Sequence, residues 1–195
     1  MSRSYNILHA HPHYPEKRLF FALWPPRETA NEIYAAAQTL HTPGSSRLVR
    51  LERLHLTIAF LGSVHDDRLA AIYRAANKTL CDPSTTSFSL HLDHYGQFRK
   101  SGIVWLGATK PPEALLHLAT TLADKLRLAG FRLEARRFRA HITLLRKATL
   151  PTAANPGSTI LWPVHELTLV ESKTTLRGVN YQILHRWSLA ASQTG

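Results

Sequence analysis

The chain has 195 residues, of which 44% are hydrophobic and 19% are charged, a composition that argues against wholesale disorder. It has 24 Lys and Arg against 13 Asp and Glu, a formal net charge of +11. Such a surface should attract polyanions such as nucleic acid, although a charge that serves only solubility explains the count equally well. The single cysteine, Cys81, excludes an internal disulfide framework and a cysteine-based zinc site. No apolar run is long enough to span a bilayer, so we expect a cytoplasmic protein without a membrane partner.

The first half of the chain alternates predicted strands and helices behind a polar start. Residues 1–17 lack apolar periodicity and are predicted to form a mobile N-terminal extension. A dense apolar run at 18–24 predicts a buried strand that ends at two prolines, and apolar residues at steps of three and four predict a helix after it. A second strand is predicted at 54–61, followed by a helix that Asp66 or Asp67 can cap.

The second half is richer in predicted strands. Strands are expected at 88–92 and 103–106, separated by a polar segment at 94–102, and a long helix is expected between Pro112 and Gly130. The final strands are predicted at residues 141–145, 166–170 and 181–189. The pattern lacks the regular alternation and glycine-rich turn of a nucleotide-binding parallel sheet, so we expect an α+β fold with largely antiparallel sheets.

Two stretches share one pattern: a histidine, an apolar residue, a threonine and a second apolar residue. The first contains His55 and Thr57, and the second contains His141 and Thr143. Because side chains alternate between the two faces of a strand, each motif places its histidine and threonine on one face and its apolar residues on the other. Each motif therefore offers one imidazole and one hydroxyl side by side.

Two such strands facing each other across a cleft would surround a single small group, and a phosphate fits that set. Opening a cyclic phosphodiester requires a base, an acid and donors for the phosphoryl oxygens. Histidines with an ordinary pKa of about 6.5 can hold opposite protonation states near neutral pH, and threonine hydroxyls can donate to phosphate. These residues therefore predict acid–base chemistry at a phosphate. They leave the order of the two histidines open, and for each motif alone a satisfied histidine beside a surface threonine is the alternative.

Other side chains near the motifs are candidates for substrate contacts. Arg146 could clamp two phosphate oxygens, but residues 141, 143 and 145 share a face in a regular strand, so this contact requires the strand to end or bulge. Phe20, Phe98 and Trp105 could stack on a base, with packing in the core as the alternative for each. The basic run at 136–139 could steer RNA toward the site or form a solvated face.

The residues quoted above resemble the two-histidine phosphoesterase superfamily, and most closely its bacterial RNA 2',3'-cyclic phosphodiesterases, also called 2'-5' RNA ligases. Residues 18–23 resemble the first strand of the family, 54–62 its first motif, 104–107 its central strand and 137–146 its second motif. One departure is Ala140, where the family usually has a proline before the second histidine.

The resemblance implies that residues 18–190 form a single domain of two pseudo-symmetric lobes, each an antiparallel sheet backed by helices, with the motifs facing a central cleft. It implies hydrolysis of the 2',3'-cyclic phosphate ends of RNA to a 2'-phosphomonoester without metal or cofactor, and a weak reverse joining through a 2'-5' linkage. By the same resemblance His55 is the proton donor and His141 the proton acceptor. The expected partner is RNA with such ends, for example tRNA fragments, and the expected state is a monomer. A non-catalytic module that binds RNA ends or nucleotides in the same cleft is the alternative.

Overall fold

The structure is a computed structural model that describes residues 15–135, 137–176 and 178–191. The elements in these ranges are, in chain order, β1 (Glu16–Leu23), α1 (Arg27–Leu40), β2 (Arg47–Leu48), η1 (Leu51–Arg53), β3 (Leu56–His65), η2 (Asp66–Arg68), α2 (Leu69–Leu80), β4 (Phe88–Leu92), β5 (His94–Phe98), η3 (Arg99–Ser101), β6 (Ile103–Gly107), α3 (Glu113–Leu128), β7 (His141–Arg146), β8 (Ile160–Val164), β9 (Glu166–Thr175) and β10 (Gly178–Ser188). This set confirms the predicted α+β class.

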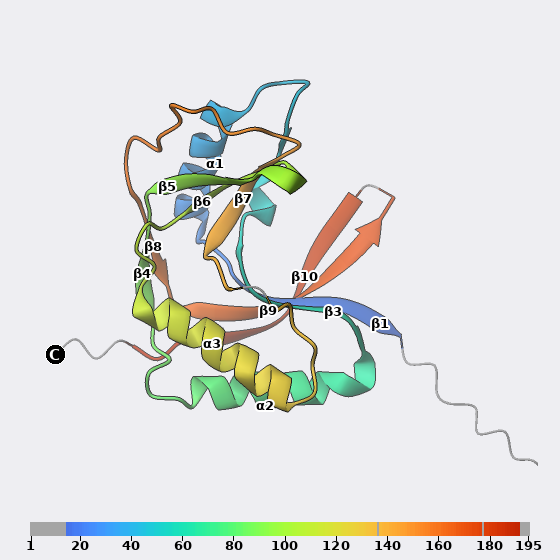
Figure 1. Ribbon diagram of the computed structural model, residues 1–195. Helices are drawn as coiled ribbons and strands as arrows, with labels where there is room; N and C mark the ends of the chain where they lie inside the picture. Colours follow the sequence, from blue (N-terminus) through green and yellow to red (C-terminus); the bar gives the residue numbers. More distant parts are fainter. Residues whose placement is uncertain (1–14, 136, 177, 192–195) are drawn as a thin grey trace, which may run out of the picture.

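Eight of these strands form one sheet, which is divided into two lobes. Its order is β10-β9-β1-β3-β7-β6-β5, and β2 pairs with β7 on the side. All of its strand pairings are antiparallel. β3 and β7 share only the residue pair Leu56 and Ile142, so β10-β9-β1-β3 and β7-β6-β5 splay apart there. We call these halves the β1 lobe and the β6 lobe (Figure 1). A separate two-stranded sheet pairs β4 with β8.

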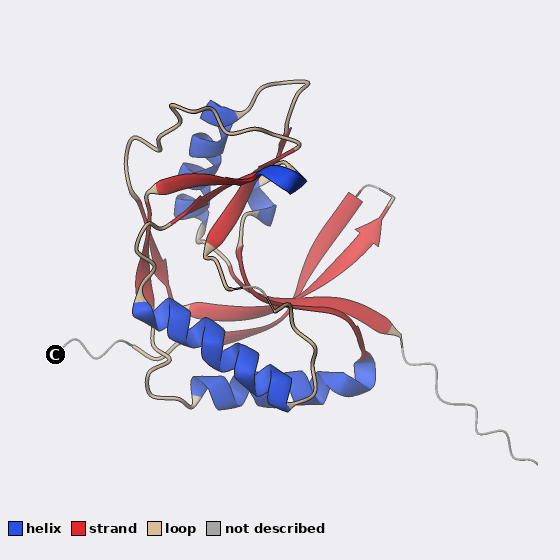
Figure 2. Cartoon of the chain, viewed as in Figure 1, coloured by secondary structure: helices blue, strands red, loops and turns tan. Residues whose placement is uncertain are grey.

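The helices cover the outer sides of the lobes and leave the faces around the junction to the strands (Figure 2). α2 and α3 pack on each other against the β1 lobe, and α1 contacts β7 and β8. α3 contributes the fully buried Leu115, Leu122 and Leu126 to the core. At about 25 cal/mol per Å² of buried apolar surface, such side chains are the main source of the stability that fixes the two lobes.

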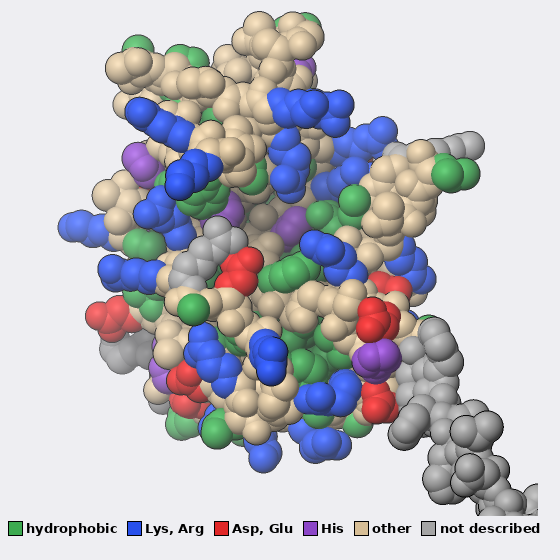
Figure 3. Space-filling view, turned by 45° about the vertical axis from the view of Figure 1, so that its right-hand side comes forward, with side chains coloured by type: hydrophobic (Ala, Val, Ile, Leu, Met, Phe, Trp, Pro, Cys, Tyr) green, Lys and Arg blue, Asp and Glu red, His purple; other side chains and the backbone are tan. Residues whose placement is uncertain are grey.

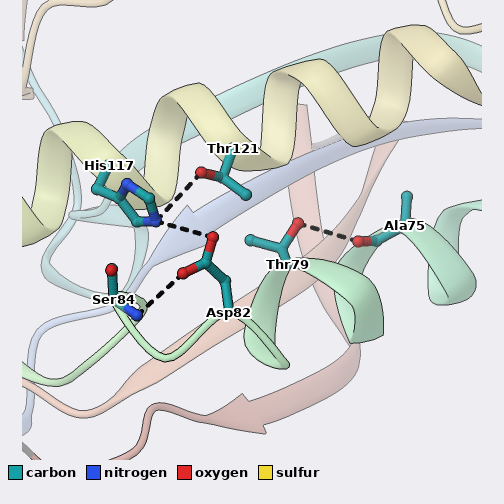
Figure 4. Close-up of polar contacts among 6 residues, drawn as sticks. All are labelled: Ala75, Thr79, Asp82, Ser84, His117 and Thr121. Atoms are coloured by element: carbon teal, nitrogen blue, oxygen red, sulfur yellow. Dashed lines mark hydrogen bonds and ion pairs between the residues drawn. The ribbon is translucent and has the colours of Figure 1, made fainter.

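A small polar network fastens the end of α2 to α3 at the back of the β1 lobe (Figure 4). The Asp82 carboxylate lies 3.2 Å from His117 Nε2 and accepts a hydrogen bond of 2.9 Å from the Ser84 backbone N–H. Within α2, the Thr79 hydroxyl donates to the Ala75 carbonyl over 3.0 Å. Only the contact between Asp82 and His117 joins residues far apart in sequence, and it links the end of α2 to α3.

Several details differ from the sequence-based expectation, including the short strand β2, which was not predicted. Glu16 and Lys17 were predicted to belong to the N-terminal extension, but they are part of β1. Lys17 forms an ion pair of 2.7 Å with Asp66, so its charge has a partner in this strand. Residues 1–14 lie outside the described residues. β5 occupies part of the segment 94–102 that was expected to separate two strands, and β8 was not predicted, because its Pro163 is unusual in a strand.

Candidate active site at the junction of the two lobes

The junction of β3 and β7 brings the two His-x-Thr motifs together. Leu56 and Ile142 form its one residue pair, and both are fully buried on the core side. Because side chains alternate along a strand, the flanking motif residues lie on the opposite face, and all four of them are half-buried. They are His55, Thr57, His141 and Thr143. Figure 3 shows histidine side chains in a hollow between the lobes, with Lys and Arg side chains around it.

The two histidines are held in the same way. His55 Nδ1 lies 2.7 Å from the Arg53 carbonyl oxygen, and His141 Nδ1 lies 2.7 Å from the Arg139 carbonyl oxygen. A carbonyl only accepts, so each Nδ1 carries a proton and donates it. In the neutral ring Nε2 is therefore the basic nitrogen, and in the charged ring Nε2 becomes a donor. Both rings thus present Nε2 for proton transfer.

Aromatic rings surround His55. Its ring stacks on Trp24 at a centroid distance of 5.0 Å and lies 5.2 Å from Phe20 and 5.3 Å from Tyr181. This burial is the largest influence on the imidazole and lowers the pKa of His55 to about 4. The Arg53 carbonyl raises the pKa, and the charges of Arg146 and His141 lower it further. His55 is therefore neutral at pH 7 when no ligand is bound.

His141 has a different surrounding. Its ring meets Phe98 edge-on at 5.0 Å and lies 6.0 Å from Trp105. The Arg139 guanidinium lies 5.7 Å from the centroid of Phe98 and 5.9 Å from that of Trp105. A cation and two aromatic rings thus flank His141, while three aromatic rings enclose His55.

Two glycines make room for Trp105. It is the register partner of Gly96 on β5, and Gly107 follows it by two residues on β6. A Cβ added at Gly96 would lie 2.1 Å from the indole, and one at Gly107 would lie 2.9 Å from it. The indole therefore lies close over the backbone of two strands and is only 6% exposed.

A bulge in β7 turns Arg146 toward the site. Trp105 pairs with Thr143 and Val104 pairs with Leu145, so β7 has one extra residue at this point. Beyond the bulge Arg146 pairs with Ile103, which shares a face with Trp105. A contact between Arg146 and substrate required the strand to bulge, and the bulge is present. The charge of Arg146 also lowers the pKa of His55.

The structure brings the predicted motif residues and the candidates for substrate contacts to this junction but distinguishes their exposure. Of the basic run, position 136 lies outside the described residues. Phe20 and Trp105 are 4% and 6% exposed and serve as walls against the histidines, whereas Phe98 is half-buried. Sequence reasoning missed Trp24 and Tyr181. Trp24 could have been noticed as the aromatic residue that ends the first strand, but Tyr181 reaches His55 only through the long-range pairing of β10, β9 and β1.

The threonine hydroxyls and the cavities show what the site can accept. Neither Thr57 nor Thr143 has a hydrogen-bond partner for its hydroxyl within the described ranges, so both can donate to a ligand. A cavity of about 470 Å³ has Trp105 and Ala140, the residue directly before His141, in its wall. A larger one of about 770 Å³ lies between β5 and residues 148–156. Neither cavity is lined by any of the four motif residues, so cavity size alone does not mark the site.

In the part of the chain that the structure describes, no group of three or more His, Cys, Asp or Glu side chains is arranged to hold a metal ion. None of the helices in this part is long and apolar enough to cross a membrane.

The two splayed lobes with paired His-x-Thr motifs define the class of the protein, a two-histidine phosphoesterase. A family model described as the 2'-5' RNA ligase superfamily matches residues 25–175, and the chain belongs to this family.

Individual relatives agree with this assignment. An RNA 2',3'-cyclic phosphodiesterase of Escherichia coli is 36% identical over 89% of this chain and 97% of its own length. One of Thermus thermophilus is 29% identical over 88% of this chain and 90% of its own. The crystal structure of E. coli LigT complexed with 3'-AMP superimposes with a TM-score of 0.82 at 35% identity and covers 90% of this chain and 99% of that one. These matches confirm the predicted two-lobed fold.

Proposed function

We propose that this protein hydrolyses the 2',3'-cyclic phosphate ends of RNA to a 2'-phosphomonoester. The observation that carries the proposal is the junction of β3 and β7, which holds two Nδ1-anchored histidines and two unpaired threonine hydroxyls on one face. The relatives named RNA 2',3'-cyclic phosphodiesterase support the choice of substrate. The net charge of +11 supports a polyanionic partner.

In this reaction His141 Nε2 takes a proton from water, whose oxygen forms a bond to phosphorus. The bond from phosphorus to O3' breaks, and His55 Nε2 gives a proton to the departing O3'. The hydroxyls of Thr57 and Thr143 donate to the phosphoryl oxygens, and the Arg146 guanidinium offsets their negative charge. Attack by a 5'-hydroxyl of a second RNA in place of water gives the 2'-5' linkage with the same groups.

The low pKa of His55 constrains this assignment. An imidazole with a pKa of about 4 carries almost no proton at pH 7, whereas a donor must be protonated. A bound cyclic phosphate is an anion, and an anion next to the ring raises its pKa and opposes the influence of burial. His55 therefore becomes a donor in the substrate complex, and the substrate itself brings the acid into its working state.

The proposal is tested with an RNA oligonucleotide that ends in a 2',3'-cyclic phosphate, incubated with the protein in EDTA. We expect conversion to a 2'-phosphate, and a loss of at least about 100-fold in His55→Ala and in His141→Ala. His91→Ala is the matched control, because His91 is an exposed histidine on β4 outside the junction. Binding of the oligonucleotide without turnover would replace the enzyme with a module that binds RNA ends.

The proposal also covers the RNA that the protein binds and its oligomeric state. Transfer RNA fragments with cyclic phosphate ends are one candidate, and the protein is expected to act as a monomer. Sedimentation of the purified protein with and without such a fragment measures both. A stable dimer, or equal affinity for a fragment with a 3'-hydroxyl end, would count against these two expectations.

A further inference from the structure

The cavity of about 470 Å³ with Trp105 and Ala140 in its wall has no task in hydrolysis of the cyclic phosphate as described above. Its walls come from the β6 lobe, the start of α3 and the segment that leads into β7. The side chains that give it its character are His94, Trp105, Arg137, Phe138 and Arg139. Its volume lies within the range of small-molecule sites, which is about 300–1,000 Å³.

Two residues of the cavity wall lie next to His141. Ala140 lines the cavity and directly precedes His141 in the chain. The indole of Trp105 also lines it, and its centroid lies 6.0 Å from the ring of His141. The cavity therefore lies on the His141 side of the site, and none of the three rings that enclose His55 is in its wall.

The lining has the chemistry of a nucleotide site. Arg137 and Arg139 have exposed guanidinium groups, which stack on bases and donate to phosphate or base oxygens, and Phe138 and Trp105 add aromatic surface. None of the described residues that line the cavity carries a carboxylate, so nothing in its wall repels a nucleic acid.

The geometry of phosphoryl displacement relates the cavity to a particular nucleotide. The attacking and leaving oxygens lie on opposite sides of the phosphorus, roughly in line. If His141 activates the attacking group, the ribose with its departing O3' lies toward His55, and the attacking group arrives from the side of His141. In hydrolysis that group is water. In the joining reaction it is the 5'-hydroxyl of a second nucleoside, whose ribose and base need space on that side.

We propose that the cavity holds the nucleoside that carries the 5'-hydroxyl, and that it is an acceptor site for formation and cleavage of 2'-5' linkages. This proposal rests on the proposed function. In cleavage, the O3' hydroxyl of a 2'-5' linked dinucleotide attacks phosphorus and gives its proton to His55 Nε2. The bond from phosphorus to O5' breaks, and O5' takes a proton from His141 Nε2. The products are a 2',3'-cyclic phosphate and a free 5'-hydroxyl nucleoside.

Two substrates of equal charge distinguish binding in the cavity from general electrostatic attraction to a basic protein. A 2'-5' linked dinucleoside monophosphate and a 2',3'-cyclic mononucleotide each carry one negative charge, but only the dinucleotide has a second nucleoside. In Arg137→Ala/Arg139→Ala, we expect the ratio of the two kcat/KM values, dinucleotide over cyclic mononucleotide, to fall about tenfold, as the loss of two cation contacts to one nucleoside implies. The Arg139 carbonyl that holds His141 stays in place in this variant.

The matched control is Arg74→Ala/Lys78→Ala, which removes the same two positive charges from exposed positions on α2 and should leave the ratio unchanged. An unchanged ratio in Arg137→Ala/Arg139→Ala would overturn the proposal. So would a loss confined to longer oligonucleotides with a cyclic end, because the cavity would then hold the upstream part of the same strand. A wild-type protein that hydrolyses the cyclic mononucleotide but does not cleave the dinucleotide would overturn the acceptor site and leave the proposed function intact.

Discussion

The unusual pKa of His55 makes the stability of the protein sensitive to acid. The structure lowers this pKa from 6.5 to about 4, chiefly because three aromatic rings bury the imidazole. In the unfolded chain the same side chain titrates near its ordinary value of about 6.5. Between these two values the unfolded state binds one proton more than the folded state, so the free energy of unfolding rises with pH across this window. The contribution is fully present above about pH 6.5 and is lost as the pH falls through about 4.

The size of the effect follows from the shift. Each pKa unit corresponds to about 1.36 kcal/mol, so a shift from 6.5 to about 4 gives about 3 kcal/mol between pH 7 and pH 4. This is a large part of the total stability of an ordinary domain, about 5–15 kcal/mol. The pKa of Asp82, which the Ser84 backbone N–H lowers, adds its own pH dependence, and the comparison of two proteins that share Asp82 removes it.

The perturbation is His55→Gln, which keeps a polar side chain but cannot titrate. Urea unfolding of both proteins at pH 7 and at pH 4 gives the loss of stability for each, and we expect the wild type to lose about 3 kcal/mol more than the variant. Nuclear magnetic resonance titration of the His55 ring should show its midpoint near pH 4, and higher with inorganic phosphate bound. A midpoint near 6.5 in the free protein, or equal losses in the two proteins, would refute the reasoning.

Three further predictions test the surroundings of the histidines. Trp24→Leu should move the pKa of His55 upward in the same titration, because it opens one side of the aromatic enclosure to water. Gly96→Ala should lower the free energy of unfolding by about 1–3 kcal/mol, since the new methyl group overlaps Trp105, and Gly96→Ala/Trp105→Leu should recover part of that loss in a urea melt. Arg146→Lys should weaken binding of the cyclic substrate more than about fivefold, because Lys lacks the bidentate fork, and an unchanged KM would exclude a clamp.

The sequence carried the chemistry of the site because that chemistry is local. A histidine and a threonine two residues apart in a strand share a face wherever the strand lies in the fold, so the four motif residues could be named from their spacing. The pairing of Leu56 with Ile142, which sets the motifs against each other, is a contact between distant segments that spacing does not reveal. The resemblance to a family supplied this part of the prediction.

Other features stayed hidden because their cause lies on another strand. The sequence of β5 resembles a polar loop that contains a glycine. A glycine is required at position 96 because the indole of Trp105 on β6 leaves no room for a side chain. The bulge in β7 that turns Arg146 toward the site is visible only in the register with β6. The sequence indicated that Arg146 could reach the substrate only if the strand ended or bulged, but it did not show that β7 has a bulge.

The two halves of the site are symmetric in their backbone and asymmetric in their walls. The backbone carbonyl two residues before each histidine accepts a hydrogen bond from its Nδ1, and the threonine of each motif follows the histidine by two residues. The rings that decide their electrostatics come from outside the motifs, from β1 and β10 at His55 and from β5 and β6 at His141. Acid–base catalysis needs two imidazoles in different protonation states, which a perfectly symmetric pair would not favour. The side chains around the repeated motif therefore give the two histidines different surroundings, and in the proposed mechanism a bound phosphate determines when His55 is charged.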